Sequence, residues 1–339
     1  MRAAGTRRGR LRRELLALSD PLLVLRALGL GDLLTALPAL RGLRRGFPDS
    51  RIVLATAPEL GRLATGAVDD VLPASGLAPL AWPGAGGHLA VNLHGSGPRS
   101  HRVLLDTRPR RLLSYAHPAV SLVGPTWDPA EHEVARWCRL LDWYGVPADP
   151  TDLLLPPAPE ASPAPGAVVI HPGAAYASRR WPVERFAAVA DALTRDGHPV
   201  VVTGSAVERG LAERVVTGSE AVSLAGRLSL AELVPLLQRA RLVVVGDTGV
   251  GHLATACAAP TVHLFGPEPP SRWGPLIQPD RHVVLWHGQR PGDPRGATLD
   301  PALAAITVAE VLAAAYTLLP LLAQPGSVSP PTGASTSPV

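Results

Sequence analysis

The most suggestive polar residues lie in the stretch D-T-G-V-G-H, which runs from Asp247 to His252 after an apolar, β-branched run that ends at Gly246. That run predicts a buried strand, and the small residues from His252 onward predict a helix. The free amides at the start of such a helix favour an anion such as phosphate. A carboxylate at Asp247 would repel phosphate and is better suited to accept hydrogen bonds from ligand hydroxyls. A nucleotide sugar has both features, whereas the structural alternative is that Asp247 or Thr248 only caps the helix.

Two other loops in the second half of the chain carry polar side chains after predicted strands. The loop H-P-G-A-A-Y-A-S-R-R contains Gly173, Arg179 and Arg180, and the loop T-G-S-A-V-E ends at Glu208. Loops that follow parallel strands meet at one edge of the sheet, so we expect these residues to lie near Asp247. The arginines can neutralise a diphosphate through bidentate contacts, and Glu208 can hold ribose hydroxyls. The alternatives are a surface charge for Arg180 and a helix cap or first-turn acid for Glu208.

One turn in the first half of the chain has comparable chemistry. Gly29, Gly31 and Asp32 stand between a predicted strand and a predicted helix, at the mouth of a cleft. A dinucleotide-binding fingerprint would need a third glycine where Leu34 stands, which counts against NAD. Asp32 suits a general base that takes the proton of an attacking hydroxyl, and it equally suits a helix N-cap. His94, at the end of another predicted strand, is either an acceptor contact or a structural histidine.

The composition narrows the classes of function. The 339 residues include no lysine, which excludes a P-loop and any mechanism that uses a lysine Schiff base. Cys138 and Cys257 are far apart and lack C-x-x-C spacing, so we expect no disulfide framework or zinc site, and a cytoplasmic location is the default. No apolar run reaches the roughly 20 residues that cross a bilayer.

The formal net charge is only +4, but the N-terminus is crowded with arginines, at Arg7, Arg8, Arg10, Arg12 and Arg13. This segment predicts either a solvated tail or a weak attachment to anionic lipid headgroups at the inner face of a membrane. We expect no nucleic-acid partner, because the basic run is not interleaved with aromatic residues and the rest of the chain is nearly balanced in charge.

The order of the predicted elements divides the chain into two α/β domains separated by the proline-rich stretch P-P-A-P-E-A-S-P-A-P-G. The predicted parts are a basic tail (1–19), an N-terminal domain (20–155), a linker (156–166), a C-terminal domain (167–322) and a tail that is disordered by composition (323–339).

Three motifs resemble glycosyltransferase family 9, the heptosyltransferase family. They are G-D-L-L-T-A-L-P-A-L-R-G-L-R from Gly31, H-P-G-A-A-Y-A-S-R-R-W-P-V-E-R-F-A from His171, and L-A-G-R-L-S-L-A-E-L followed by V-V-G-D-T-G-V-G-H-L-A-T-A. The resemblance implies a GT-B fold, with two Rossmann-like domains that face each other across a cleft. The first would bind the acceptor and the second the nucleotide-sugar donor, and a C-terminal helix, for which residues 302–319 are the candidate, would return to the first domain.

The resemblance also implies roles for single residues. Asp32 would be the catalytic base, Arg179 would take the place of the family's usual lysine at the diphosphate, and Asp247, Thr248, Gly249 and His252 would form the donor loop. The family inverts the anomeric centre and needs no dedicated metal site, and neither a metal nor another cofactor is predicted here.

The sequence therefore predicts an inverting glycosyltransferase. It would move a heptose or related sugar from a nucleotide diphosphate, with ADP as the expected carrier, to a hydroxyl of a glycan or lipid-linked acceptor. The predicted place is the cytoplasm, with peripheral contact at the inner membrane face left open. The alternatives are a nucleotide-sugar epimerase of the same fold and a non-catalytic protein that binds nucleotide sugars.

Overall fold

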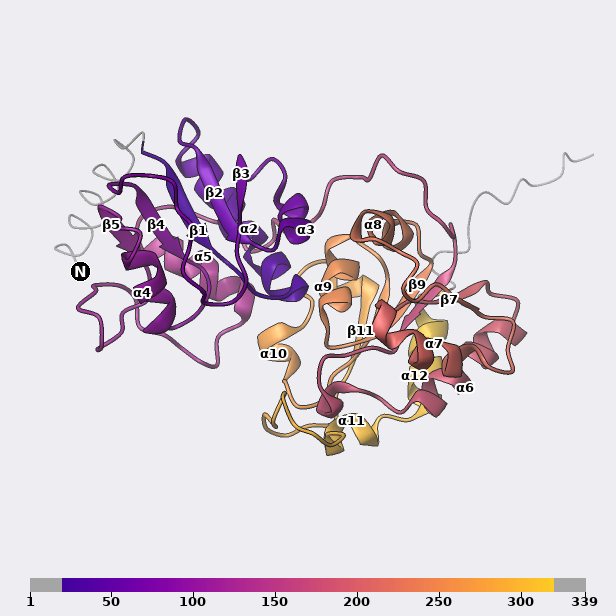
Figure 1. The fold of residues 1–339 in the computed structure, drawn as a ribbon. Coiled ribbons are helices and arrows are strands. Elements are labelled where there is room, and N and C mark those ends of the chain that lie inside the picture. The colour runs from indigo at the N-terminus through magenta and orange to yellow at the C-terminus, as the bar shows by residue number, and fades with distance from the viewer. Residues whose placement is uncertain (1–19, 320–339) are drawn as a thin grey trace, which may run out of the picture.

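The computed structural model describes residues 20–319, which form two α/β domains side by side (Figure 1). Each domain contains one parallel sheet, ordered β3-β2-β1-β4-β5 in the first and β11-β10-β9-β6-β7-β8 in the second. The predicted tails 1–19 and 323–339 lie outside the described residues.

The strands of the first sheet are β1 (Leu22–Leu25), β2 (Ile52–Thr56), β3 (Asp70–Pro73), β4 (Leu89–Asn92) and β5 (Arg111–Leu113). Those of the second are β6 (Val168–His171), β7 (Val200–Val202), β8 (Val222–Ser223), β9 (Leu242–Gly246), β10 (Thr261–Leu264) and β11 (His282–Leu285). The helices of the first domain are α2 (Leu30–Gly46), α3 (Pro58–Gly61), η1 (Arg62–Ala64), α4 (Arg99–Leu105) and α5 (Glu133–Trp143). The helices of the second are η2 (Ala177–Arg179), α6 (Val183–Arg195), η3 (Ala206–Glu208), α7 (Arg209–Val216), α8 (Leu230–Gln238), α9 (Gly249–Ala256), α10 (Pro270–Trp273), η4 (Pro279–Arg281), α11 (Pro301–Ala305) and α12 (Val308–Leu318).

The apolar strands form because both faces of each sheet are covered. In β1, Leu22 and Val24 belong to one hydrophobic cluster, while Leu23 and Leu25 belong to another on the opposite face. Alternating side chains therefore point into different cores, which is why the central strands are continuous apolar runs rather than alternating ones.

The strand order places functional loops at the switch point of each sheet. In the first sheet β1 lies between β2 and β4, and in the second β6 lies between β7 and β9. Chain connections depart to opposite sides at these points, which leaves a crevice beyond the carboxyl ends of the strands. The loops after β1, β6 and β9 open into that crevice, as their sequences predict.

The two domains meet where the first turns of α2 and α9 cross. A methyl group on Gly31 would lie 2.6 Å from Cδ2 of His252, and one on Gly249 would lie 2.8 Å from Cβ of Leu30. Both glycines thus permit an approach that larger residues would block. One hydrophobic cluster continues through this contact, from Leu33 of the first domain to Leu253 of the second.

The segment that connects the domains has neither helix nor strand between residues 144 and 167. Its first part is nonetheless fixed to α8, because the side-chain amide of Gln238 donates to the carbonyl of Pro156 and accepts from the amide of Ala158, each at 2.8 Å. The beginning of the predicted linker is therefore held against α8 by hydrogen bonds. The limits of the linker at 156 and 166 stay a prediction.

The helix after β9 begins at Gly249, directly after Thr248, one of the two residues expected to cap it. One predicted element differs from the structure. The predicted helix over 302–319 is two helices that break at Ile306, whose carbonyl accepts from the Trp181 indole at 3.0 Å and the Arg185 guanidinium at 2.6 Å.

Within the described residues, the expected return of this helix to the first domain is also wrong. α12 packs against α6 and against strands β9, β10 and β11 of its own domain. Over residues 20–319 no helix combines the length and apolar character that crossing a membrane requires.

We predict that Gly249→Ala destabilises the protein. The added methyl would overlap backbone and Cβ atoms of the opposite domain, so the two domains would have to move apart. Overpacking of this kind costs about 1–3 kcal/mol. The matched control is Gly210→Ala, because Gly210 also lies in the first turn of a helix and has nothing within 4 Å of the added carbon. Thermal denaturation should show a lower Tm for Gly249→Ala and an unchanged or higher Tm for the control. A Gly249→Ala protein as stable as the wild type would show that the contact is not tight.

Candidate functional site

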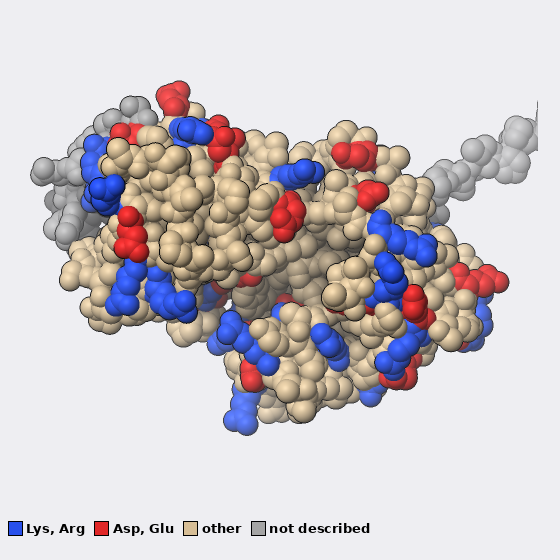
Figure 2. Space-filling model, viewed as in Figure 1, with Lys and Arg blue, Asp and Glu red and all other residues tan. Residues whose placement is uncertain are grey.

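A cavity of about 850 Å³ lies between the two domains, and the space-filling view shows the surface hollowed there (Figure 2). The turn between β1 and α2 forms one side, and the loops after β6, β7, β8, β9, β10 and β11 form the other. The predicted site residues that line it are Asp32, Gly173, Arg179, Glu208, Asp247, Thr248, Gly249 and His252.

Asp247 lies at the end of β9 and is nearly buried, with 7% of its side chain exposed. Its carboxylate oxygens lie 4.0 Å from the Arg179 guanidinium and 4.0 Å from Nε2 of His252. Burial raises the pKa of Asp247 to about 6, and the nearby charge of Arg179 opposes that rise. Burial likewise lowers the pKa of His252 to about 4, so the imidazole is neutral at pH 7. At this end of the cavity, the Asp247 carboxylate, whose ionised form burial disfavours, therefore lies beside the Arg179 cation.

Thr248 is the residue before α9 and has the extended backbone of a helix N-cap, but its side chain makes no capping hydrogen bond. Its Oγ1 atom is buried without a partner in the described part of the chain, and it lines the cavity. The first amides of α9 have no acceptor within the helix. This end of α9 is thus equipped to donate hydrogen bonds to an anion.

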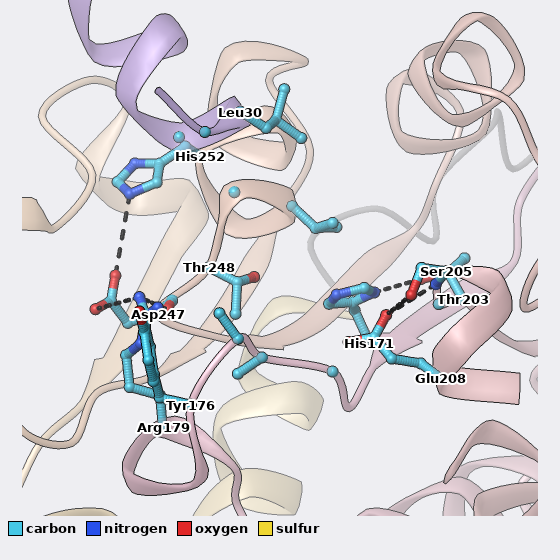
Figure 3. Close-up of a pocket in the computed structure, with 18 of the residues that line it drawn as sticks. Leu30, His171, Tyr176, Arg179, Thr203, Ser205, Glu208, Asp247, Thr248 and His252 are labelled. Atoms are coloured by element: carbon cyan, nitrogen blue, oxygen red, sulfur yellow. Dashed lines mark hydrogen bonds and ion pairs between the residues drawn. The ribbon is translucent and has the colours of Figure 1, made fainter. Parts of the chain in front are cut away.

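Arg179, in the short helix η2, supplies the positive charge beside that helix end. Its guanidinium donates to the carbonyl of Asp247 at 3.3 Å and lies 5.7 Å from the centre of the Tyr176 ring. Its Nε atom is buried and has no partner among residues 20–319. Figure 3 shows Arg179, Asp247 and His252 gathered at one end of the pocket, with Thr248 between them and a second polar group.

The second polar group surrounds Glu208. One carboxylate oxygen of Glu208 accepts from the amide of Ser205 at 2.8 Å and from its hydroxyl at 2.7 Å. Burial acts to raise the pKa of Glu208, but these hydrogen bonds and the His171 and Arg180 charges outweigh it and lower the pKa. Glu208 is therefore both the helix cap that the structural alternative predicts and a lining residue of the cavity. Gly173 lies opposite it, and a side chain there would meet the Glu208 carboxylate, which would have to move aside.

Asp32 projects from the first turn of α2, on the other domain. Its carboxylate accepts from the amide of Gly29 at 3.2 Å and lies 3.6 Å from the guanidinium of Arg26. Its side chain is 32% exposed, so it reaches the cavity while serving its own helix end. Burial raises the pKa of Asp32, and the Arg26 charge opposes that rise. A carboxylate with a raised pKa is a better proton acceptor than an ordinary one.

Two predicted site residues are not among those that line the cavity. Arg180 donates from Nε to the carbonyl of Ala174 at 2.8 Å, so it holds the shape of the loop that carries Arg179. His94 follows β4, and burial together with the Arg26 charge lowers its pKa to about 4. Donor binding by Arg180 and acceptor binding by His94 stay predictions.

Sequence reasoning missed several residues of the cavity. Tyr176, Glu268, Trp273 and Arg295 all line it, and the Trp273 ring meets the His252 ring edge to face at 5.6 Å. Glu268 follows β10, the neighbour of β9, so the strand-end argument used for Asp247 could have found it. Trp273 ends the short helix α10, whereas Tyr176 and Arg295 come from irregular segments whose positions no periodic pattern predicts.

Across residues 20–319, no group of three or more histidine, cysteine, aspartate or glutamate side chains is arranged to hold a metal ion.

Comparisons with known proteins identify a family whose model matches this chain. The model of glycosyltransferase family 9 (heptosyltransferase) matches residues 128–300, which include α5 and most of the second domain. Lipopolysaccharide heptosyltransferase 1 of Pseudomonas aeruginosa is 36% identical over 161 residues, which are 45% of each chain. The alignment thus spans about half the length of that curated relative.

Two solved structures share the fold over most of the chain. Glycosyl transferase family 9 from Veillonella parvula has a TM-score of 0.72 and 21% identity, over 89% of this chain and 97% of its own. ADP-heptose lipopolysaccharide heptosyltransferase II of Escherichia coli has a TM-score of 0.69 and 19% identity, over 89% and 99%.

The fold is thus GT-B, as predicted: two Rossmann-like domains that face each other across a cleft. This chain belongs to glycosyltransferase family 9, the heptosyltransferase family.

We predict that Asp247→Asn stabilises the folded protein in a pH-dependent way. A pKa raised from 3.8 to about 6 means that ionised Asp247 costs the folded state about 3 kcal/mol above pH 7. In the wild type, the stability that protonated Asp247 contributes is lost as the pH rises from about 4 to about 6. The variant does not lose it, because asparagine does not titrate. The gain in unfolding free energy over wild type should grow from about 1 kcal/mol at pH 4.5 to about 3 kcal/mol at pH 7.5.

Denaturant unfolding at the two pH values measures this difference. An asparagine variant that is less stable than wild type at both would show that the Asp247 carboxylate stabilises the fold.

Proposed function

We propose that this protein is an inverting glycosyltransferase that moves a sugar from a nucleoside diphosphate to the hydroxyl of a glycan or lipid-linked acceptor. The observation that carries the proposal is that Asp32 of the first domain lines the same cavity as Asp247, Thr248 and Arg179 of the second. A proton acceptor thus faces a group suited to hold a phosphorylated sugar.

The donor would lie along the polar groups of the second domain. The diphosphate would sit at the first turn of α9, beside Thr248 and Arg179, where helix amides and the guanidinium favour an anion. Glu208 would accept from ribose hydroxyls at one end. The loop after β8 lies against that end, since the amide of Gly226 donates to the carbonyl of Gly204 at 2.8 Å. Its neighbour Leu228 lines the cavity and offers an apolar contact for the base.

The transferred sugar would occupy the opposite end, near Asp247. This carboxylate is buried, and it would accept hydrogen bonds from hydroxyls without competing with phosphate for the same amides. Asp247 would read sugar hydroxyls there, and Asp32 would stand on the acceptor side of the anomeric carbon.

The reaction would be one displacement. Asp32 takes the proton of the acceptor hydroxyl while that oxygen forms a bond to the anomeric carbon. The bond from that carbon to the diphosphate oxygen breaks at the same time, and its electron pair leaves with the nucleoside diphosphate. Arg179 and the α9 amides stabilise the charge that grows on the leaving group. Attack from the face opposite the diphosphate inverts the anomeric centre, and Asp32 then gives its proton to water.

The relatives suggest the identity of the substrates. Relatives of this chain are named lipopolysaccharide heptosyltransferases, and the E. coli structure is titled an ADP-heptose enzyme. We therefore propose ADP-heptose or a related ADP-sugar as the donor and a lipopolysaccharide-type core as the acceptor. The cytoplasmic face of the inner membrane is the proposed place, where the basic segment 1–19 would meet anionic lipid.

The experiment that tests this function measures release of nucleoside diphosphate from ADP-heptose, with and without a truncated lipopolysaccharide core. Release that needs the core, together with a glycoside of inverted configuration by NMR, supports the proposal. A changed sugar nucleotide without acceptor would indicate an epimerase, and binding without any turnover would indicate a non-catalytic binding protein. Either result overturns the proposed reaction.

We predict that Asp32→Asn lowers kcat by about 10²–10⁴-fold, because asparagine keeps the size of the base but cannot accept the proton. The dissociation constant of the donor should stay within about twofold, since Asp32 contacts the acceptor side. Steady-state kinetics and calorimetry measure the two effects. Turnover at the wild-type rate would remove Asp32 from the mechanism.

We predict that Asp247→Ala lowers the affinity for the sugar nucleotide about tenfold more than the affinity for the free nucleoside diphosphate. The reason is that one charged hydrogen bond to a hydroxyl is worth about 1.5 kcal/mol or more. Titration of both ligands gives the ratio. If the two affinities fall equally, Asp247 does not contact the sugar.

A further inference from the structure

A buried ionic network lies behind Asp32, and none of its other members was predicted to be a site residue. Arg26, immediately after β1, has a side chain with no exposed surface. Its guanidinium donates to the carbonyl of Asp32 at 2.8 Å, to the carbonyl of Leu93 at 2.5 Å and to Oγ1 of Thr35 at 3.1 Å. It also donates to the carboxylate of Glu133 at 3.1 Å. One side chain therefore joins the turn that carries the base to β4 and α5.

Glu133 closes the network from α5. The same oxygen that accepts from Arg26 accepts from the Trp137 indole at 2.9 Å, and the other oxygen pairs with Arg136. The Arg26 guanidinium lies 4.8 Å from the centre of the Trp137 ring. Separating the members of such a buried pair would leave an uncompensated buried charge, which is energetically costly. The pair therefore acts as a rigid support, unlike an exposed ion pair on the surface.

The position of Asp32 follows from this support. Its carbonyl accepts from both Arg26 and Thr35, and its carboxylate accepts from the Gly29 amide. The main chain and side chain of the predicted base are thus fixed on two sides before any acceptor binds. Displacement of a reacting group by about 1 Å can cost about 10²-fold in rate, so such fixing matters for turnover.

We propose that Arg26 and Glu133 are a positioning pair that sets both the place and the charge of Asp32, with opposite electrostatic effects on it. Arg26 favours the ionised base, and Glu133 disfavours it while holding Arg26 in place. This inference rests on the proposed role of Asp32 as the base.

The electrostatics of the free protein support this assignment. Burial raises the pKa of Asp32, the charge of Arg26 lowers it and the charge of Glu133 raises it. From the second domain, Arg179 faces Asp32 and lowers its pKa, Asp247 faces it as a second carboxylate, and His252 is neutral at pH 7. Among the charges that act on Asp32, that of Arg26 has the largest effect on its pKa.

The test is the acidic limb of the pH profile of kcat/KM, which reports the ionisation of the base in the free enzyme. The limb rises as Asp32 loses its proton. Asp247, whose pKa is about 6, also titrates there, but neither Arg26 nor Glu133 is among the charges that shift its pKa, so the test reads the change of the limb between variants. Glu133→Gln removes a negative charge and should move the limb to lower pH, while Arg26→Gln removes a positive charge and should move it to higher pH. The double variant should return the limb toward its wild-type position.

Arg26→Lys separates position from charge. Lysine keeps the positive charge but cannot reach all the partners of the guanidinium fork, so kcat should fall by about tenfold or more while the acidic limb stays in place. If Arg26→Gln does not fold, Arg26→Lys and Glu133→Gln still test the two halves of the proposal.

The matched control is Arg41→Gln. Arg41 also ties α2 to a distant segment, through the Asp152 carboxylate at 2.8 Å and the Leu154 carbonyl at 2.7 Å, but it is not among the charges that affect Asp32. It should leave the acidic limb unmoved. Limbs that shift in the same direction for Glu133→Gln and Arg26→Gln, or that shift equally for Arg41→Gln, would overturn the positioning pair. Wild-type protein without transfer activity would instead overturn the proposed function.

Discussion

The contact between the first turns of α2 and α9 is the constraint on which the site depends. Each helix follows a central strand of its own parallel sheet, so each directs its amide end toward the crevice beyond that sheet. Gly31 and Gly249 let the two ends approach until the backbone of one domain nearly touches that of the other. This approach brings Asp32 to a cavity that the second domain otherwise builds alone.

The charge distribution of the cavity follows from its burial. Asp32, Asp247 and Glu268 are carboxylates whose pKa burial raises, and the charge of Arg179 opposes that rise in all three. Such a site is costly to keep ionised in the free protein. A ligand rich in hydroxyls, with its negative charge confined to one end, suits the arrangement because hydroxyls satisfy the carboxylates while amides and arginine take the phosphate.

Arg26, which supports the proposed base, shows how the fold stabilises a buried cation. Arg26 lies at the end of an apolar strand, where an unpaired guanidinium would be strongly unfavourable. Its donors are distributed over a turn, a strand end and a helix, which fixes three elements relative to one another. The same contacts make the position of Asp32 a property of the whole first domain and not of its local turn.

The sequence by itself determined the two α/β domains, because apolar runs and glycine turns specify strands and strand ends locally. It also placed Asp32, Glu208 and Asp247 at strand ends, and the parallel arrangement made their convergence predictable. Only the tertiary structure decided that α12 stays on its own domain and that Arg180 holds a loop rather than lining the cavity. It alone revealed the Arg26–Glu133 pair, since residues 107 positions apart meet only through the packing of α5 against α2. Local pattern specifies each element, but the distances between elements depend on packing across the chain, which no local pattern encodes.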